Sequence, residues 1–555
     1  MRYTVDMHLV RNKYNHIGKK IRKIYESVLL MESYREGGKV KKRTIANLSA
    51  CSEAEINAIE MALKNKHDVD ALGSIRGVVD VEEDKSIGAV FLLKQMAERL
   101  GITKALGTNR SGKLALWQVI ARVLDQGSRL SAVRLAKSQA AELIVEKEDF
   151  TEDDLYDNLA FLSENQDQIE RRLFKEREVK TSSTLFLYDV TSSYLEGDQN
   201  YFAQYGYNRD KKKGKLQIVI GLLCDETGAP VSVEVFDGNT QDPKTFGNQV
   251  QKAAQRFGCH SVTMVGDKGM IKQTQINDLP EGFHYITTIT KAQIEGLIQT
   301  GTFQMELFTN DLVEIQEKEV RYILRRNPQR VQEMQANRES KRDTIIKRIN
   351  KKNDYLNNHP RAKMEVAKKE IDETIKKLKL ESWCLVEIAD RKLHLKEDSD
   401  AMRHDARYDG CYVIKTDLPA EIVKDTIHNR YKDLAKVEQA FRSMKTNYLE
   451  VRPVFVRKES STRGHVLIVM LAYLLIWRLR QLWENLDTTV EEGLDQLKTL
   501  CAIKVSVKGQ GQSLKIPKPR KFSCELLTAA NISLPATINL PAINVDTKVK
   551  LQDRR

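Results

Sequence analysis

The sequence lacks the cysteine patterns and the long apolar runs that mark several common classes of protein. Its seven cysteines are scattered, without a CxxC pair or a zinc-ligand spacing, which argues against a disulfide framework or a structural metal. The longest apolar run, Val466 to Trp477, is too short to span a bilayer, so we expect a buried core helix there. The first stretch, MRYTVDMHLV, lacks the apolar segment of a signal peptide. We therefore expect a protein of the reducing cytoplasm that does not enter a membrane.

Positive charge, in contrast, is in surplus. The chain of 555 residues carries a formal net charge of +13 and has a pI near 9.1. A chain of this length can form several domains, each with its own core. A positive surplus indicates an anionic partner, and nucleic acid is the most common soluble one.

The N-terminal part of the chain divides into two predicted regions. Residues 1–70 are expected to form a β-hairpin and a helix, because strand patterns at Tyr25–Tyr34 and Lys39–Leu48 flank a turn that contains glycine. Helical patterns then continue through residues 71–180. This second region is either a reader of DNA ends or a structural collar, and the sequence favours neither.

The periodicity changes to that of β-strands at Leu185. The apolar run Leu185–Tyr188 leads into Asp189, and a later strand pattern, Val262–Gly266, leads into Asp267. Strands and helices follow one another here in the order of a ribonuclease-H-like fold, in which Asp189 and Asp267 would end neighbouring central strands at one edge. Taken alone, Asp189 is better explained as a capping or turn residue, and the later carboxylates change that balance.

A helix is predicted over Tyr431 to Lys445. Apolar side chains repeat on one face at spacings of three and four, and Leu434 belongs to this buried stripe. Glu438, Arg442 and Lys445 share the neighbouring face, where Glu438 and Arg442 can also be explained as a surface ion pair. Ordinary turn or N-cap roles explain three further carboxylates in this half of the chain: Asp225, Asp237 and Asp242.

Together these patterns predict an α/β protein with a ribonuclease-H-like mixed sheet, flanking helices and an inserted subdomain. Its core is expected in two parts, residues 181–311 and 411–485, separated by an insertion at 312–410 with a basic helical hairpin. Residues 486–555 are expected to be a basic C-terminal tail, which after about Thr499 is interrupted by prolines and is expected to be loosely ordered or to lie on DNA. From Arg321 to Leu380 the chain has 18 Lys and Arg against 8 Asp and Glu, which either keep a solvated hairpin soluble or contact DNA.

Three carboxylates, from Asp189, Asp267 and Glu438, would make a site for divalent metal. Mg²⁺ prefers oxygen ligands, and phosphodiester chemistry uses two such ions about 3.5–4 Å apart. Asp189 would be shared by both ions, and Asp267 and Glu438 would each hold one of them. We therefore expect two Mg²⁺ ions as the cofactor, with Mn²⁺ able to substitute.

Several stretches of the chain, taken in order, resemble the DDE transposases of bacterial insertion sequences. Between residues 25 and 480 the similar stretches are YESVLLMESYREGGKV, YDVTSSYLEG, DGNTQDPKTF, VGDKGMI, RYILRRNP, YVIKTDLP, YKDLAKVEQAFRSMKT, LEVRPVF and GHVLIVMLAYLL. The chain is more similar to the branch with a Tyr-Arg-Glu-Lys signature, whose relatives excise DNA through hairpin ends. The resemblance implies that Asp189, Asp267 and Glu438 are the catalytic triad.

The signature also implies residues that contact DNA phosphates. Tyr431 and Lys445 match its tyrosine and its lysine, but Leu434 stands where the signature has an arginine. The missing contact would then be absent or supplied by Arg430 or Arg442.

The resemblance implies a transposase that cleaves DNA at insertion-sequence ends and joins the freed 3′-hydroxyl ends to target DNA. Its partners would be double-stranded DNA, as terminal inverted repeats and target, and a second copy in a homodimer on paired ends, with no small-molecule substrate. It would act at the nucleoid in the bacterial cytoplasm. We expect further DNA contacts from Lys268, Lys347, Lys351 and Lys352. Two alternatives stay open: a ribonuclease-H-like DNA nuclease without strand transfer, and a non-catalytic DNA-binding protein derived from a transposase.

Overall fold

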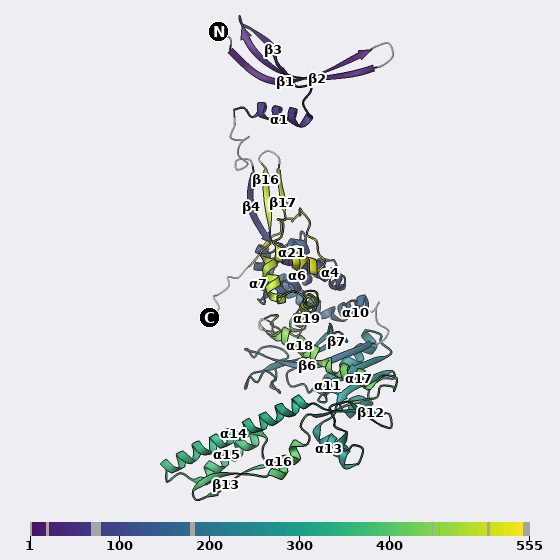
Figure 1. Ribbon diagram of the computed structural model, residues 1–555, viewed down its shortest axis with the longest axis vertical. Helices are drawn as coiled ribbons and strands as arrows, with labels where there is room; N and C mark the ends of the chain where they lie inside the picture. The colour runs from purple at the N-terminus through teal and green to yellow at the C-terminus, as the bar shows by residue number, and fades with distance from the viewer. Residues whose placement is uncertain are drawn as a thin grey trace. The chain divides into compact units, whose positions relative to one another are not determined.

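The computed structural model describes residues 3–17, 22–67, 79–177, 184–446, 448–453, 456–507 and 511–547. The chain divides into two compact units (Figure 1). The first unit combines Met1–Lys85 with Leu500–Lys518 and Leu534–Asn539. The second unit combines Ser86–Thr499 with Pro519–Ser533 and Leu540–Arg555, and it contains every residue of the predicted catalytic site.

One sheet of the first unit contains the predicted hairpin. Its three antiparallel strands, in sheet order, are β1 (Tyr3–Ile17), β2 (Arg22–Glu36) and β3 (Lys39–Asn47). The turn between β2 and β3 uses Gly37 and Gly38, whose φ angles of 58° and 78° favour glycine. The hairpin therefore forms where the sequence predicted it, and β1 extends it to three strands.

A helix and a second sheet complete the first unit. Helix α1 (Glu53–Lys64) begins with a capping box, in which the Ser52 hydroxyl accepts a hydrogen bond from the backbone of Glu55 and the Glu55 carboxylate caps Ser52 in return. The second sheet has the order β17-β16-β4 and joins segments far apart in the sequence: β4 (Val79–Ser86), β16 (Cys501–Val507) and β17 (Gly511–Lys515).

The predicted loosely ordered tail is regular structure through much of its described length, so that prediction was wrong. Besides β16 and β17, it forms α20 (Val490–Lys498) and α21 (Lys521–Ala529), which belong to the second unit. Leu497 and Leu526 of these helices are fully buried, and Trp483 donates a hydrogen bond of 3.0 Å to the Leu526 carbonyl. Apolar residues at helical spacing give this segment a core despite its lysines and prolines.

Helices dominate the start of the second unit, as predicted. They are α4 (Gly88–Arg99), α5 (Ile102–Leu106), α6 (Arg110–Leu124), α7 (Arg129–Ser138), α8 (Glu142–Val145), α9 (Glu152–Glu164) and α10 (Gln166–Arg177), with a short strand pair of β5 (Phe150–Thr151) and β18 (Val545–Asp546). Helix α19 (Glu459–Leu482) packs against α6, α9 and β8 (Figure 1). A Cβ on Gly464 of α19 would lie 2.2 Å from the Leu159 carbonyl oxygen, so the close approach of α9 and α19 requires glycine.

Helix α19 carries the longest apolar run of the sequence. Among the described residues it is the one helix long and apolar enough to cross a membrane, and 72% of its apolar window is buried inside the fold. It is a core helix, as the length of the run predicted.

An eight-stranded mixed sheet forms the centre of the second unit, in the order β11-β12-β15-β10-β9-β6-β7-β8. The strands are β6 (Thr184–Tyr194), β7 (Gln217–Asp225), β8 (Pro230–Asp237), β9 (Val262–Val265), β10 (Phe283–Thr288), β11 (Val313–Glu317), β12 (Val320–Arg326) and β15 (Cys411–Thr416). Strands β6, β7 and β8 are antiparallel neighbours, while β9 is parallel to both β6 and β10. This is the ribonuclease-H-like arrangement that the sequence predicted.

The remaining helices of this region connect and cover the strands. They are α11 (Asp242–Gln251), continued by the π-helical turn Lys252–Arg256, α12 (Gln273–Asn277), α13 (Lys291–Gln299), the 3₁₀ turn Met305–Leu307, α17 (Lys424–Lys432) and α18 (Leu434–Lys445). Phe186, Tyr188, Phe246 and Met264 belong to the apolar core that joins the sheet to α11. The core therefore fixes β6 and β9, the two strands that lead into the predicted catalytic aspartates.

The insertion is a helical hairpin with a small sheet. It consists of α14 (Pro328–Asn358), α15 (Met364–Leu378), β13 (Cys384–Ala389), β14 (Lys392–Glu397) and α16 (Ser399–Ala406) (Figure 1). Ile345, Ile349, Ile371 and Trp383 pack into a core of its own. We expected the insertion to begin at residue 312, but β11 and β12 belong to the large sheet, so it begins after Arg326.

The predicted helix over Tyr431–Lys445 is interrupted. Helix α17 ends at Lys432 and α18 begins at Leu434, so Tyr431 and Leu434 do not share one continuous helix face. Val437, Phe441 and Met444 are buried as predicted, whereas Leu434 is only partly buried. Leu434, predicted in the same buried stripe, is covered only in part because it occupies the first turn after the break.

Candidate active site

Asp189 lies within β6, not at its end. The strand continues to Tyr194 because it pairs with β7 along its whole length, and Asp189 faces Leu222 in that register. Its parallel pairing with β9 stops earlier, at Leu187 and Val265. Asp189 therefore stands just past the point where β9 ends, which is the position that brings it near the residues that follow β9.

Asp267 and Glu438 approach the same place from two other elements. Asp267 is exposed in the turn after β9, where its backbone carbonyl accepts hydrogen bonds from Met270 and Ile271. Glu438 is an exposed residue of α18, the helix that packs on β6. Asp189, Asp267 and Glu438 all line one open cleft with a volume of about 690 Å³.

The surroundings of Asp189 in the cleft disfavour its ionised form. Burial raises the pKa of Asp189 to about 7, although the backbone N–H of Val190 and the guanidinium of Arg209 favour the ionised form. The carboxylates of Asp267 and Glu438 raise this pKa further. The site thus holds carboxylates of one sign close enough to repel one another.

Tyr431 is close to these carboxylates, although it does not line the cleft. Its hydroxyl lies 3.1 Å from the Thr288 hydroxyl at the end of β10. Burial raises the pKa of Tyr431, and the negative charges of Asp267, Glu438 and Asp189 raise it further. Tyr431 and Glu438 are therefore close to each other, although a break separates α17 from α18.

Lys445 is held by three polar contacts, two to β6 and one to the loop that follows it. Its ammonium forms an ion pair with Asp210 and donates to the Ser192 carbonyl at 2.8 Å and to the Thr191 hydroxyl at 3.2 Å. Lys445 and Arg442, both on α18, line the cleft. The spacing of these residues on the helix predicted that they would share a face with Glu438.

Sequence reasoning missed the contribution of the loop between β6 and β7. Arg209 and Asp210 of this loop line the cleft, and Arg209 donates to both carboxylate oxygens of Asp242 at 2.7 Å. We predicted Asp242 as an N-cap, but the cap is Gln241 and Asp242 is the first residue of α11. The cap was therefore predicted one residue too late, and the pairing of Asp242 with Arg209 was missed because Arg209 lies in a loop without periodicity.

The other predicted DNA contacts lie outside the cleft. Arg430 is partly exposed on α17, and Lys268 is exposed beside Asp267. Lys347 and Lys351 are exposed on α14 of the insertion. Lys352 is engaged within the insertion, because its ammonium lies 2.5 Å from the Glu370 carboxylate on α15.

The carboxylates suit a divalent cation in chemistry but do not form a complete coordination site. Within the part of the chain that the structure describes, no group of three or more His, Cys, Asp and Glu side chains is arranged to hold a metal ion. The expected convergence of the three carboxylates on one or two cations is therefore not observed among the described residues. The oxygen donors of Asp189, Asp267 and Glu438 are nevertheless of the type that Mg²⁺ and Mn²⁺ prefer, and a cation would offset their mutual repulsion.

Comparisons with known proteins identify the family. The family model of the transposase DDE domain matches residues 180–475, just over half of the chain, and that of the N-terminal domain of the IS1634 family transposases matches residues 17–71. No curated protein matches the chain. Neither match separates the branch with the Tyr-Arg-Glu-Lys signature from others, so that assignment stays a prediction. The chain belongs to the DDE transposases of insertion sequences.

Proposed function

We propose that this chain catalyses metal-dependent cleavage at insertion-sequence ends and transfers the freed 3′-hydroxyl ends into target DNA. The observation that carries the proposal is the position of Asp189, Asp267 and Glu438 along one cleft of the ribonuclease-H-like sheet. The raised pKa of Asp189 supports it, because perturbed carboxylates concentrate at functional sites. DDE transposase domains generally use divalent metals.

The three carboxylates would hold Mg²⁺ or Mn²⁺, as two ions, with Asp189 shared between them. The metal, when bound, supplies Lewis-acid activation of the attacking water or 3′-hydroxyl and stabilises charge on the leaving oxygen. Arg209 neutralises Asp242, which keeps a further negative charge of the cleft in an ion pair. The rigid sheet under Asp189 and the packed helix under Glu438 would fix the donors before DNA arrives.

Cationic and hydroxyl groups around the cleft would position the DNA. We assign phosphate contacts to Tyr431, Arg442 and Lys445, with Arg430 and Lys268 farther out. Leu434 offers no hydrogen bond, so the arginine contact of the signature would come from Arg442 or Arg430 or would be absent. Lys445 reaches DNA only by exchanging Asp210 for a phosphate. Exposed lysines of the insertion, Lys347 and Lys351, would add non-specific contacts.

The experiment joins a pre-cut DNA end to a second duplex. Purified protein is mixed with a duplex that carries the DNA flanking its own gene, ending in a free 3′-hydroxyl, and with a labelled target duplex in Mg²⁺. Joined product, absent with chelator and absent for Asp189→Asn, is the expected result. Cleavage of an uncut end without joining would identify a nuclease, and binding without either reaction would identify a DNA-binding protein. Light scattering with paired ends tests the proposed homodimer.

A further inference from the structure

The loop between β6 and β7, residues 195–216, carries an unusual group of exposed aromatic rings. Tyr201, Tyr205 and Tyr207 are 62%, 69% and 83% exposed, more than any other large apolar side chain that the structure describes. We call residues 195–216 the tyrosine loop. Exposed apolar rings grouped on one surface mark interaction sites more often than isolated ones do.

The exposure of these rings does not result from a detached loop. Gln204 and Gln217 exchange two backbone hydrogen bonds, of 3.1 and 3.0 Å, and Phe202 between the tyrosines is buried. A Cβ on Gly206 would lie 2.1 Å from the Gly238 carbonyl oxygen, so glycine allows the loop to lie directly on the turn after β8. The backbone is therefore fixed on the sheet while the tyrosine rings face solvent.

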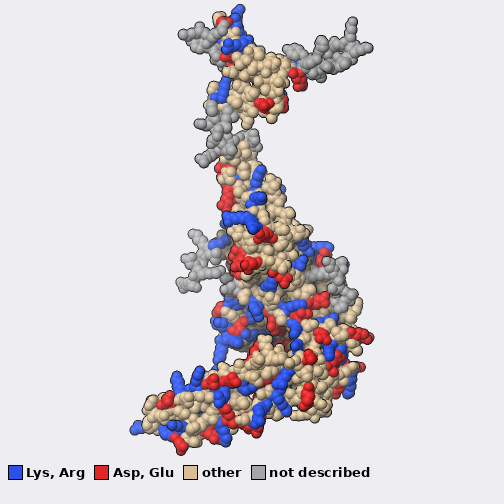
Figure 2. Space-filling view, in the orientation of Figure 1, with Lys and Arg blue, Asp and Glu red and all other residues tan. Residues whose placement is uncertain are grey.

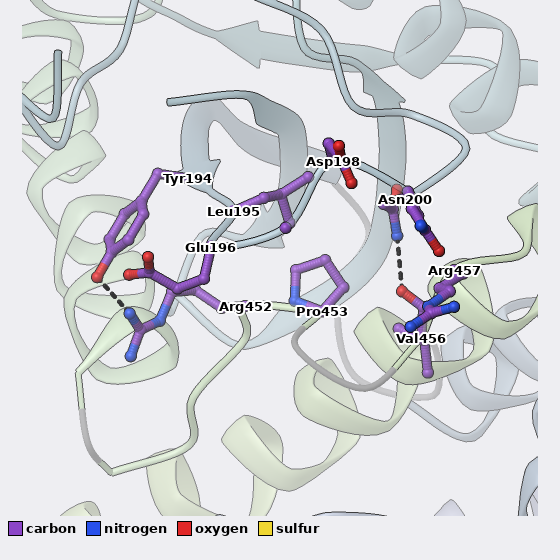
Figure 3. A pocket seen from close by; sticks show the side chains of 11 residues that line it. Tyr194, Leu195, Glu196, Asp198, Asn200, Arg452, Pro453, Val456 and Arg457 are labelled. Carbon is purple, nitrogen blue, oxygen red and sulfur yellow. Dashed lines mark hydrogen bonds between the residues drawn. The ribbon is translucent and has the colours of Figure 1, made fainter. Parts of the chain in front are cut away.

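The tyrosine loop is continuous with the candidate active site. Its residues Arg209 and Asp210 line the cleft, and the Arg209 guanidinium lies 5.9 Å from the centre of the Tyr207 ring. Tyr194, the last residue of β6 before the loop, lines both the cleft and a neighbouring pocket of about 210 Å³, and so does Arg452. In Figure 3, Arg452 points toward the Tyr194 hydroxyl on one side of this pocket.

The pocket also shows how the loop is fixed to the rest of the unit. Asn200 lies on the other side of the pocket and donates a hydrogen bond of 3.0 Å to the Val456 carbonyl (Figure 3). The same amide group donates to the Thr462 hydroxyl at 2.8 Å. The loop is therefore tied to the segment before α19 at one end and to the cleft at the other.

Positive charge follows the tyrosines directly. Lys211, Lys212 and Lys213 are exposed, and the Lys212 ammonium lies 5.8 Å from the centre of the Tyr194 ring. Two of the three acidic residues of the loop are engaged in ion pairs, Asp210 with Lys445 and Glu196 with Lys215, while the third, Asp198, is exposed and lines the neighbouring pocket. Aromatic rings beside a one-signed lysine run combine the two components of single-stranded nucleic acid binding, stacking and phosphate neutralisation.

We propose that the tyrosine loop binds an unpaired DNA strand beside the cleft, with Tyr205 and Tyr207 stacking on bases and Lys211 to Lys213 contacting phosphates. Bases within a duplex are already stacked, so exposed rings can add stacking only where bases are unpaired. Every base has a π-face, so the interaction has little sequence preference. The source of the strand, a cleaved element end, rests on the proposed function, but the binding itself needs neither metal nor catalysis.

The test compares single-stranded and duplex DNA. Fluorescence anisotropy with chelator present measures the affinity of the full chain for labelled oligothymidylate and for a blunt duplex of equal length. The double variant Tyr205→Leu/Tyr207→Leu should bind oligothymidylate about 10-fold more weakly or worse, because stacking is lost, with little change for the duplex. The matched variant Tyr205→Phe/Tyr207→Phe keeps the aromatic faces and should bind both DNAs like the wild type. Lys211→Gln/Lys213→Gln should weaken both complexes.

Several results would overturn the proposal. Unchanged oligothymidylate binding by the leucine variant would do so, as would an equal loss for duplex and single strand. A change of oligomeric state in light scattering would identify the loop as an interface between copies of the chain instead. If the double variant is misfolded by circular dichroism, the single variant Tyr207→Ser replaces it, because the Tyr207 side chain has almost no packing to lose.

The two proposals fail in distinguishable ways. Tyrosine-dependent binding of oligothymidylate by a chain that neither cleaves nor joins DNA would reject the proposed function alone. Cleavage and joining by a chain whose leucine variant binds oligothymidylate like the wild type would reject the tyrosine loop alone.

Discussion

The cleft and the helical insertion arrange their charges in different ways. In the cleft, burial raises the pKa of Asp189 to about 7 and the nearby carboxylates of Asp267 and Glu438 raise it further, although Arg209, Arg442 and Lys445 line the same cleft. On the insertion, charges of both signs are interspersed over the face that Figure 2 shows. Gathering like charges costs folding free energy, which a protein tolerates where a ligand offsets it, whereas interspersed charges cost little. The cleft is therefore the stronger indication of a binding site, although the insertion has the larger surplus of charge.

Part of the positive charge of the insertion is neutralised by acidic side chains of the same segment. Arg338 donates to both oxygens of Asp409 at 2.8 Å, Arg342 pairs with Glu397 at 2.7 Å, and Lys352 pairs with Glu370. Counting lysines and arginines in the sequence therefore overstated the charge that is available to DNA. Contact of the insertion with DNA therefore depends on its exposed basic residues, such as Lys347 and Lys351.

The largest effect is expected when the Asp189 carboxylate is removed, and removal of an exposed carboxylate of the insertion serves as the comparison. Asp189→Asn should lower DNA cleavage about 1,000-fold or more, because the shared metal ligand is lost, while end binding is retained. Without metal, the variant should unfold at a higher temperature than the wild type, since a buried repelling charge is removed. Asp354→Asn, on the exposed face of α14, should change neither quantity.

Cleavage assays on flanking DNA and thermal unfolding with chelator measure both halves of this prediction. Normal Mg²⁺-dependent cleavage by Asp189→Asn would remove the residue from the site. A lower melting temperature would show that its carboxylate is stabilised in the fold, and the contrast between cleft and insertion would then disappear.

The sequence predicted the elements of the cleft better than their ends and contacts. Apolar runs before Asp189 and Asp267 predicted two buried strands, and these strands are β6 and β9. The end of β6 was placed too early, because Thr191 to Ser193 read as polar loop, whereas pairing with β7 extends the strand through them. Local patterns report burial and periodicity, and they do not report which strand pairs with which polar stretch.

Two other differences between prediction and structure have separate causes. The ion pair of Arg209 with Asp242 joins a loop to a helix, and no periodicity marks it. The break at Asp433 was missed because the apolar spacing from Tyr431 to Met444 continues through it as though the helix were unbroken. Both differences change which side chains face the cleft without changing the fold.

The second prediction concerns ion pairs of the insertion itself. Asp409 is buried with 2% of its side chain exposed, and it joins α14 to the segment before β15 through Arg338. Asp409→Ala should cost about 1.5–3 kcal/mol of unfolding free energy, because the partly buried Arg338 guanidinium loses its two hydrogen bonds to a charged partner. Asp400→Ala should cost less than about 1 kcal/mol, because the side chains of Asp400 and of its partner Arg403 are both mostly exposed.

Urea unfolding of both variants gives the two free energies. Similar losses of unfolding free energy would mean that the buried ion pair of Asp409 stabilises the insertion no more than the exposed pair of Asp400 does. Buried and exposed charges of the insertion would then contribute equally to its stability.

A third prediction concerns a buried histidine of the helical core that lies near two arginines. His465 of α19 is buried, and burial lowers its pKa well below 6.5, with Arg122 and Arg129 lowering it further. Below about pH 6.5, His465 binds a proton in the unfolded chain but stays neutral in the folded chain. Stability should therefore fall by up to about 1.4 kcal/mol per pH unit as the pH decreases.

This pH dependence is measured best in the Asp189→Asn background. The raised pKa of Asp189 acts with the opposite sign, since its folded state binds a proton more readily than the unfolded state does. Urea unfolding between about pH 7.5 and 5.5 should show the decrease, and His465→Gln, which keeps an N–H donor for the Val451 carbonyl, should flatten it. An equally steep decrease in His465→Gln would assign it to other groups.

The smallest expected effect tests whether the exposed charge of the insertion reaches DNA at all. Lys347→Gln and Lys351→Gln should each weaken duplex binding modestly and equally for all sequences. Each should also flatten the dependence of log K on log salt by about 0.9, because one phosphate contact and its released counterion are lost. Lys396→Gln is the matched control, since Lys396 of β14 already pairs with Glu387 at 2.8 Å. Titrations at several salt concentrations give the slopes. If the slopes of Lys347→Gln and Lys351→Gln equal that of the control, these lysines face bulk water in the complex, and the insertion contacts something other than DNA.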